Sequence, residues 1–177
     1  MFKKEDIEIF HMPRWEELPE IDLYLDQVVS FIDKYLLYYL NDESSKNVEK
    51  KEQNVLTKTM INNYVKQKIM DAPVKKKYNR NNIAYLFVIS ILKQGYSIND
   101  IGNLIKFTLE TTPLEVAYNS FCDILEYTIK CTFLDKKFIY EKSSSENSYV
   151  LLNVVQTIAS KLYVEKMYLE KEQKERD

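Results

Sequence analysis

Apolar residues recur along most of the chain at intervals of three and four, the spacing that places side chains on one face of an α-helix. The first such stripe is Ile21, Leu25, Val28, Ile32, Tyr35 and Tyr39. Further helices are predicted at about 57–68, 81–94, from Ser97 onward, 113–135 and 146–173. Residues 41–53 are polar without periodicity, which indicates a flexible linker. The pattern predicts an all-helical protein, with room for one small hairpin.

Residue types that begin and end helices support these boundaries. Gly95 follows the predicted helix 81–94, at the place where a left-handed C-cap would use glycine. Ser97 stands three residues before Asp100, a capping-box pattern, and Pro113 suits the first position of the next helix. Ser143–Ser148 is predicted to be a polar break before the last helix.

A chain of 177 residues corresponds to about one domain, or to one small domain with a helical extension. We divide it into residues 1–110, holding the N-terminal helix, the linker and a helix-turn-helix region, and residues 111–177. The second part has broad apolar helix faces, so it is expected to form a C-terminal helical bundle through which two copies form a homodimer.

Residues needed for common enzyme chemistry are scarce. Gly95 and Gly102 are the two glycines, and they form no phosphate-binding loop. The single histidine, His11, leaves no histidine-based catalytic pair or conventional zinc cluster. Cys122 and Cys131 would lie on opposite faces of one helix, about 13 Å apart along its axis, so they cannot bridge each other. We therefore predict no catalytic residue, no metal site, no cofactor and no enzymatic activity.

The N-terminus, MFKKEDIEIF, lacks the apolar run of a signal peptide. No uncharged apolar stretch reaches the length of about 20 residues that a membrane span needs. Together with two unpaired thiols, these features predict a cytoplasmic protein that does not contact a membrane.

Charge is unevenly distributed, although the net charge is only −2. Residues 57–80 contain seven basic residues against one acid, whereas residues 1–45 contain four basic residues against eleven acids. A basic region on an otherwise acidic protein makes a directional field, suited to a partner such as DNA. The alternative is a solvated lysine-rich loop.

The predicted helix at 57–68 (TKTMINNYVKQK) has an unusual polar face. A helical wheel places Met60, Ile61, Tyr64 and Val65 on one side and Thr59, Asn62, Asn63 and Lys66 on the other. Asparagine is a poor helix former, yet in the major groove it can form two hydrogen bonds with adenine. We therefore predict base contacts by Thr59, Asn62 and Asn63. A surface helix in a lysine- and asparagine-rich sequence is the competing interpretation.

A basic turn follows this helix, holding Pro73, three consecutive lysines and Tyr78. A helix followed by a basic turn with an aromatic anchor is the layout of a recognition helix with a wing. The predicted phosphate contacts are Lys58, Lys66, Lys75, Lys76, Lys77 and Arg80. Tyr64 and Tyr78 are predicted to support the helix and the wing.

These residues resemble a known family. Residues 60–69 (MINNYVKQKI), Pro73, Tyr78 and residues 92–101 (LKQGYSINDI) are similar to the DNA-binding domain of MerR-type transcription regulators. The resemblance implies a winged helix-turn-helix over about a quarter of the chain. It does not extend to the C-terminal half, so the family's effector-sensing mechanism is not carried over and the effector ligand stays unknown.

A second resemblance spans most of the chain. Residues 11–29 (HMPRWEELPEIDLYLDQVV), 56–69 (LTKTMINNYVKQKI) and 72–78 (APVKKKY) resemble a bacterial domain-of-unknown-function family, number 1836. This resemblance implies only a DNA-binding role.

Two residues outside the basic region are expected to be structural. Trp15 is predicted to fill the core or clamp the N-terminal helix, with an anchor for a partner as the alternative. His11 is predicted to pack or form a hydrogen bond. The sequence thus favours a sequence-specific regulator that binds double-stranded DNA, and the alternative is a helical protein-interaction module without DNA binding.

Overall fold

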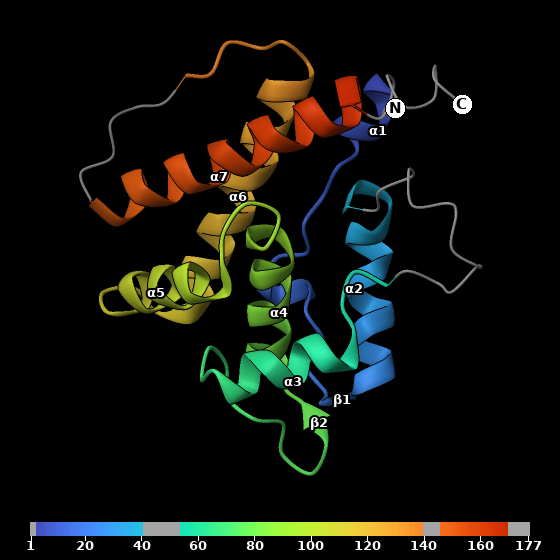
Figure 1. Cartoon of the computed structure of the whole chain (residues 1–177), viewed down its shortest axis with the longest axis vertical. Coiled ribbons are helices and arrows are strands. Elements are labelled where there is room, and N and C mark those ends of the chain that lie inside the picture. The colour runs from blue at the N-terminus through green and yellow to red at the C-terminus, as the bar shows by residue number, and fades with distance from the viewer. Residues whose placement is uncertain (1–2, 41–53, 140–145, 170–177) are drawn as a thin grey trace. The chain divides into compact units, whose positions relative to one another are not determined.

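The computed structural model describes residues 3–40, 54–139 and 146–169, and this part of the chain is mostly helical, as predicted (Figure 1). The α-helices are α1 (Lys4–Glu8), α2 (Leu25–Leu40), α3 (Lys58–Lys66), α4 (Arg80–Leu92), α5 (Ile98–Leu109), α6 (Leu114–Phe133) and α7 (Glu146–Val164). A short 3₁₀ turn, η1, covers Trp15–Glu17, and a π-helical turn, η3, covers Glu165–Leu169 after α7. Two short strands, β1 (Leu23–Tyr24) and β2 (Lys77–Tyr78), complete the described elements.

The chain contacts divide the protein into two compact units. The central unit contains the described residues 13–40 and 54–119, and the terminal unit contains the described residues 3–12, 120–139 and 146–169. Helix α6 runs from the first unit into the second. The sequence analysis divides the chain between residues 110 and 111, and the contacts group the described residues 3–12 with the C-terminal helices.

Helix α4 is the centre of the central unit. Nine of its thirteen residues are buried, which explains why its sequence is apolar on all sides. Asn79 caps its N-terminus, and the Asn79 and Asn82 side chains each accept a hydrogen bond, 3.0 Å long, from the backbone N–H of the other. Phe87 packs edge-to-face against Phe31 and Tyr35 of α2, with ring centroids 5.9 Å apart in both pairs. These contacts join α2 to α4.

The two strands pair in antiparallel register, with Leu23 opposite Tyr78 and Tyr24 opposite Lys77. Strand β2 also closes a hairpin, because Val74 bridges Lys77 across Lys75 and Lys76. Both turn residues have positive φ, 50° and 64°. This is the backbone of the two-residue turns whose twist matches that of paired strands.

Two predicted helix boundaries need correction. Gly95 is not a left-handed cap, since no glycine in the described residues has positive φ. Instead α4 ends in a right-handed turn, in which the Leu92 carbonyl accepts hydrogen bonds from Gly95 and Tyr96. The Ser143–Ser148 break is also too long, because α7 begins at Glu146. Residues 143–145, like the predicted linker at 41–53, lie outside the described residues.

Other boundaries agree closely with the sequence. Ser97 caps α5 by accepting a hydrogen bond from the Asp100 N–H, at 3.2 Å. Helix α6 begins at Leu114, one residue after the predicted position, and the Pro113 carbonyl accepts its first hydrogen bond, from Ala117.

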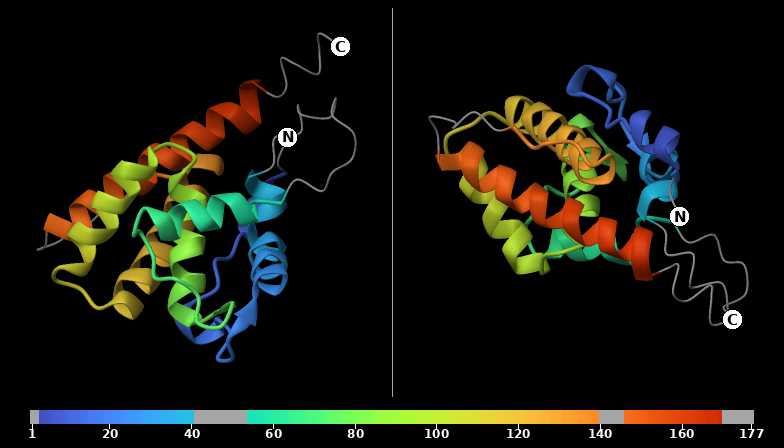
Figure 2. Two further views of the ribbon diagram at one scale, coloured as in Figure 1. Left: turned by 60° about the horizontal axis from the view of Figure 1, so that its bottom comes forward. Right: turned by 90° about the horizontal axis from the view of Figure 1, so that it is seen from above.

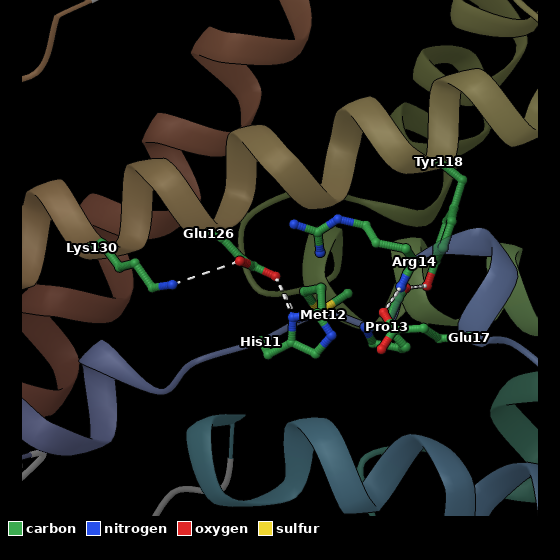
Figure 3. Close-up of polar contacts among 8 residues, drawn as sticks. All are labelled: His11, Met12, Pro13, Arg14, Glu17, Tyr118, Glu126 and Lys130. Atoms are coloured by element: carbon green, nitrogen blue, oxygen red, sulfur yellow. Dashed lines mark hydrogen bonds and ion pairs between the residues drawn. The ribbon is translucent and has the colours of Figure 1, made fainter.

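The terminal unit contains α1, the later part of α6, and α7. Cys122 and Cys131 are both buried in this unit and neither is in a disulfide, as the sequence predicted. Glu126 holds the N-terminal segment against α6, since its carboxylate accepts a hydrogen bond from the Met12 N–H (2.8 Å) and lies 3.1 Å from His11 Nδ1 (Figure 3). His11 therefore contacts a side chain of its own unit, and the sequence analysis did not predict α1.

Candidate nucleic-acid interface

Helix α3 is oriented by one buried side and presents its other side to solvent. Thr57 caps the helix, its hydroxyl accepting a hydrogen bond from the Met60 N–H at 3.2 Å. Ile61 is fully buried and Tyr64 is 5% exposed. The predicted outer face is confirmed, since Thr59, Asn62, Asn63 and Lys66 are all exposed. Met60, predicted to face inward, is instead 40% exposed.

The end of α3 is closed by a lysine in an unfavourable backbone conformation. Lys68 has φ 59°. Its N–H bonds the Val65 carbonyl at 3.0 Å, and the Ile69 N–H bonds the Tyr64 carbonyl at 3.1 Å. This is the two-bond C-terminal motif in which glycine is usual at the left-handed position.

Ile69 then anchors the end of α3 against α5. A Cβ atom added at Gly102 would lie 3.4 Å from Ile69 Cγ1, at the short limit of ordinary van der Waals contact. A residue without a side chain at position 102 therefore allows the two segments to approach closely.

The segment before α3 is held by two charged side chains that the sequence analysis did not single out. The Lys93 ammonium group donates to the Val55 carbonyl at 2.5 Å, and an Asp33 carboxylate oxygen accepts from the Val55 N–H at 2.8 Å. Burial lowers the pKa of Lys93, and the charge of Asp33 opposes that shift. A lysine at the end of a buried helix gives no sequence signal of this role, because its partner is a backbone carbonyl distant in sequence.

The hairpin after α3 is anchored at its base and exposed at its tip. Tyr78 is 4% exposed, which confirms its predicted packing role. The Asn82 amide donates to the Asp71 carbonyl at 3.0 Å and fixes the chain leading into the hairpin. Lys75 and Lys76 at the tip are exposed. The hairpin and α3 lie at the same end of the central unit (Figures 1 and 2).

Two of the predicted phosphate contacts are engaged within the protein. The Lys77 ammonium group lies 5.2 Å from the centroid of the Tyr24 ring. The Arg80 guanidinium group lies 5.8 Å from the centroid of the Trp15 ring, and one of its nitrogens is 3.7 Å from Glu20. Arg80 therefore packs against the central unit more than Lys58, Lys66, Lys75 and Lys76, which are exposed.

Trp15 has the structural role predicted for it. Its ring packs edge-to-face on Tyr118, with centroids 6.2 Å apart, and its backbone N–H donates to Asn119 at 2.8 Å. The Tyr118 hydroxyl donates to the Pro13 carbonyl at 2.8 Å (Figure 3). The segment before α2 is thereby fixed to the start of α6.

A groove of about 740 Å³ lies beside the C-terminal end of α3. Its lining includes Lys68, Ile69, Tyr85, Asn99, Asn103 and Lys106. The sequence does not reveal it, because its residues come from three separate segments, the turn after α3, α4 and α5. Within the described residues, no group of three or more histidine, cysteine or acidic side chains is arranged to hold a metal ion.

The comparisons with known proteins add one match. The family model described as "Domain of unknown function (DUF1836)" matches residues 13–121, nearly the span of the central unit. No curated protein and no solved structure matches the chain. Among the described helices, none has the length and apolar character required to cross a membrane.

Proposed function

The chain belongs to the DUF1836 family of domains of unknown function, and we propose that its central unit binds double-stranded DNA sequence-specifically to regulate transcription. In this proposal α3 lies in the major groove, in the manner of a winged helix-turn-helix, and the hairpin follows the neighbouring backbone. Thr59, Asn62 and Asn63 contact bases. The lysines of α3 and the hairpin contact phosphates.

The observation that carries the proposal is the outer face of α3. Its exposed side chains are a hydroxyl, two amides and an ammonium group, and its opposite side is fixed by buried Ile61 and Tyr64. An exposed helix gains stability from good helix formers, and asparagine is not one of them. Amides are the side chains that read adenine in the major groove. The side-chain oxygen of Asn63 (Oδ1) accepts a hydrogen bond from the Gln67 side-chain amide at 3.1 Å, an exposed bond that a base contact would replace.

The backbone of the three left-handed lysines gives independent support. Lys68, Lys75 and Lys76 adopt positive φ, where a side chain costs roughly 1–2 kcal/mol and glycine is favoured. Lysine at all three positions places positive charge beside α3 at a cost in stability. Strained residues of this kind gather at functional sites.

The local excess of positive charge supports a charged partner. Residues 57–80 contain seven basic residues against one acid and would attract phosphates, and Glu20 is the acidic side chain paired with one of them, Arg80, at 3.7 Å. Phosphate contacts release counterions, so affinity should fall steeply as salt increases.

Salt-dependent binding to a mixed-sequence DNA duplex tests the phosphate contacts. The slope of log affinity against log salt should decrease by about one for Lys75→Ala, because one phosphate contact is removed, and all sequences should weaken alike. Lys34→Ala removes an exposed lysine of α2 and should leave the slope unchanged. No measurable binding by the wild-type chain would contradict the proposal and favour a protein-interaction module.

A further inference from the structure

Helix α7 has an exposed surface that lacks charged side chains over most of its length. Residues 147–160 (NSYVLLNVVQTIAS) include no charged side chain, in a protein that is 29% charged. The inner side of this helix is buried in the terminal unit, with Leu152, Val155 and Ile158 at most 5% exposed. The outer positions are therefore uncharged for a reason other than burial in that core.

The outward side chains fall within one narrow sector. At 100° per residue, Tyr149, Asn153, Gln156, Ser160 and Tyr163 span about 80°. We call these five residues the α7 face. All five are exposed, with Tyr149 at 60% and Tyr163 at 40%. Tyrosine enrichment together with a lack of charge is the composition of the centre of a protein interface.

Two polar side chains on and beside the α7 face bond to the backbone of their own helix. The Asn153 amide donates to the Tyr149 carbonyl at 2.8 Å. The Thr157 hydroxyl, at the edge of the face, donates to the Asn153 carbonyl at 2.9 Å. These two side chains keep a hydrogen bond when water is removed, which lowers the cost of burying this part of the face.

We propose that the α7 face binds the α7 face of a second copy of this chain, with the two helices antiparallel across a twofold axis. A twofold interface places each surface patch against itself, so a patch of one charge repels its copy and an uncharged patch does not. The charges at the two ends of the face are complementary under this symmetry. Glu146 and Lys161 lie on the same edge of the helix and are symmetric about Asn153 and Val154.

Antiparallel pairing centred between Asn153 and Val154 therefore brings Glu146 of one copy beside Lys161 of the other, twice in each dimer. Lys161 also pairs with Glu165 of its own helix at 3.1 Å, so the contact adds a second carboxylate to an exposed ion pair. This inference rests on the terminal unit and does not depend on DNA binding.

Light scattering of the full chain over about 1–100 μM provides the first test. The wild type should have twice the chain mass of 21.1 kDa. Asn153→Lys should give the single-chain mass, because it brings two lysines together near the axis. Asn103→Lys is the matched control, an exposed asparagine on α5, and should remain dimeric. A wild-type monomer at every concentration, or a dimer that Asn153→Lys leaves intact, would overturn the proposal.

Charge reversal separates a second copy from any other partner. Glu146→Lys and Lys161→Glu should each weaken dimerisation roughly tenfold, since two surface ion pairs are lost together. The double variant should regain most of the affinity, because each pair is restored with opposite polarity. If the double variant dimerises no better than the single variants, the antiparallel pairing is wrong. Circular dichroism checks that each variant keeps its helices.

Discussion

Helices α3 and α7 both bury one side and expose asparagines on the other, yet their exposed sides differ in charge and in backbone. Beside α3 lie exposed lysines, three of them at left-handed positions. The α7 face has no charged side chain, and Asn153 bonds to its own helix. The exposed side of α3 is suited to a charged partner, and that of α7 to an uncharged one.

The difference shows that an exposed asparagine on a helix does not by itself indicate which kind of partner the helix binds. Its surroundings decide, because an amide beside lysines can contact an anionic polymer, whereas an amide bonded to its own helix can be buried against another protein. Four predictions test the roles assigned to these two surfaces.

Removing the buried anchor of α3 should have the largest effect. Ile61 is fully buried, so Ile61→Ala should lower the free energy of unfolding by about 2–5 kcal/mol through lost burial and a new cavity. Thr59→Ala, on the exposed side of the same helix, should change it by less than about 0.5 kcal/mol. Urea denaturation measures both. A loss below about 1 kcal/mol for Ile61→Ala would mean that α3 is not held by this side.

Exchanging one asparagine on each helix for alanine separates the two surfaces directly. Asn62→Ala should weaken binding to the preferred DNA sequence by about 1–3 kcal/mol and relax the preference at one base pair. Asn153→Ala should leave the affinity for one half-site unchanged. Competition binding with sequence variants of the site measures the preference. Equal losses on every sequence for Asn62→Ala would make α3 a backbone contact and not a base reader.

Replacing Lys66 or Lys68, at the end of α3, with glycine should change the free energy of unfolding in opposite directions. Lys68→Gly relieves a left-handed side chain and should raise the free energy of unfolding by about 0.5–1 kcal/mol. Lys66→Gly, two residues earlier in the right-handed helix, should lower it by about 1 kcal/mol. Both variants should bind DNA more weakly. If Lys68→Gly destabilises the protein, the strain argument for these lysines fails.

Alkaline pH should lower the free energy of unfolding through Tyr78 at the base of the hairpin, by less than the substitutions above. Burial raises the pKa of Tyr78 above its ordinary value of 10.0. The folded state therefore keeps a proton that the unfolded state loses, and this contribution to stability disappears as pH rises past 10. Between pH 9 and pH 11, around the ordinary tyrosine pKa, the wild type should lose free energy of unfolding relative to Tyr78→Phe. Urea midpoints at these pH values measure it, and a pH-independent difference would contradict the shift.

The sequence predicted the elements whose causes are local. The face of α3, the cap at Ser97 and the packing of Tyr78 follow from periodicity and residue type within a few positions. Contacts between segments distant in sequence could not be predicted. Examples are the hydrogen bond from Lys93 to the Val55 carbonyl and the packing of Ile69 against Gly102. Gly95 was misjudged because the right-handed turn after α4 satisfies the last carbonyls without a left-handed residue. No local pattern reveals that Arg80 lies against the Trp15 ring, since the two residues are 65 positions apart.

The most direct test of DNA recognition is selection of bound fragments from sheared genomic DNA by the purified chain, at about 0.15 M salt, followed by sequencing. Our account predicts enrichment of one motif, arranged as an inverted repeat if two copies pair through α7. Binding without an enriched motif would contradict sequence-specific reading by Asn62 and Asn63. No binding at all would contradict the assignment of the α3 and hairpin surface to DNA.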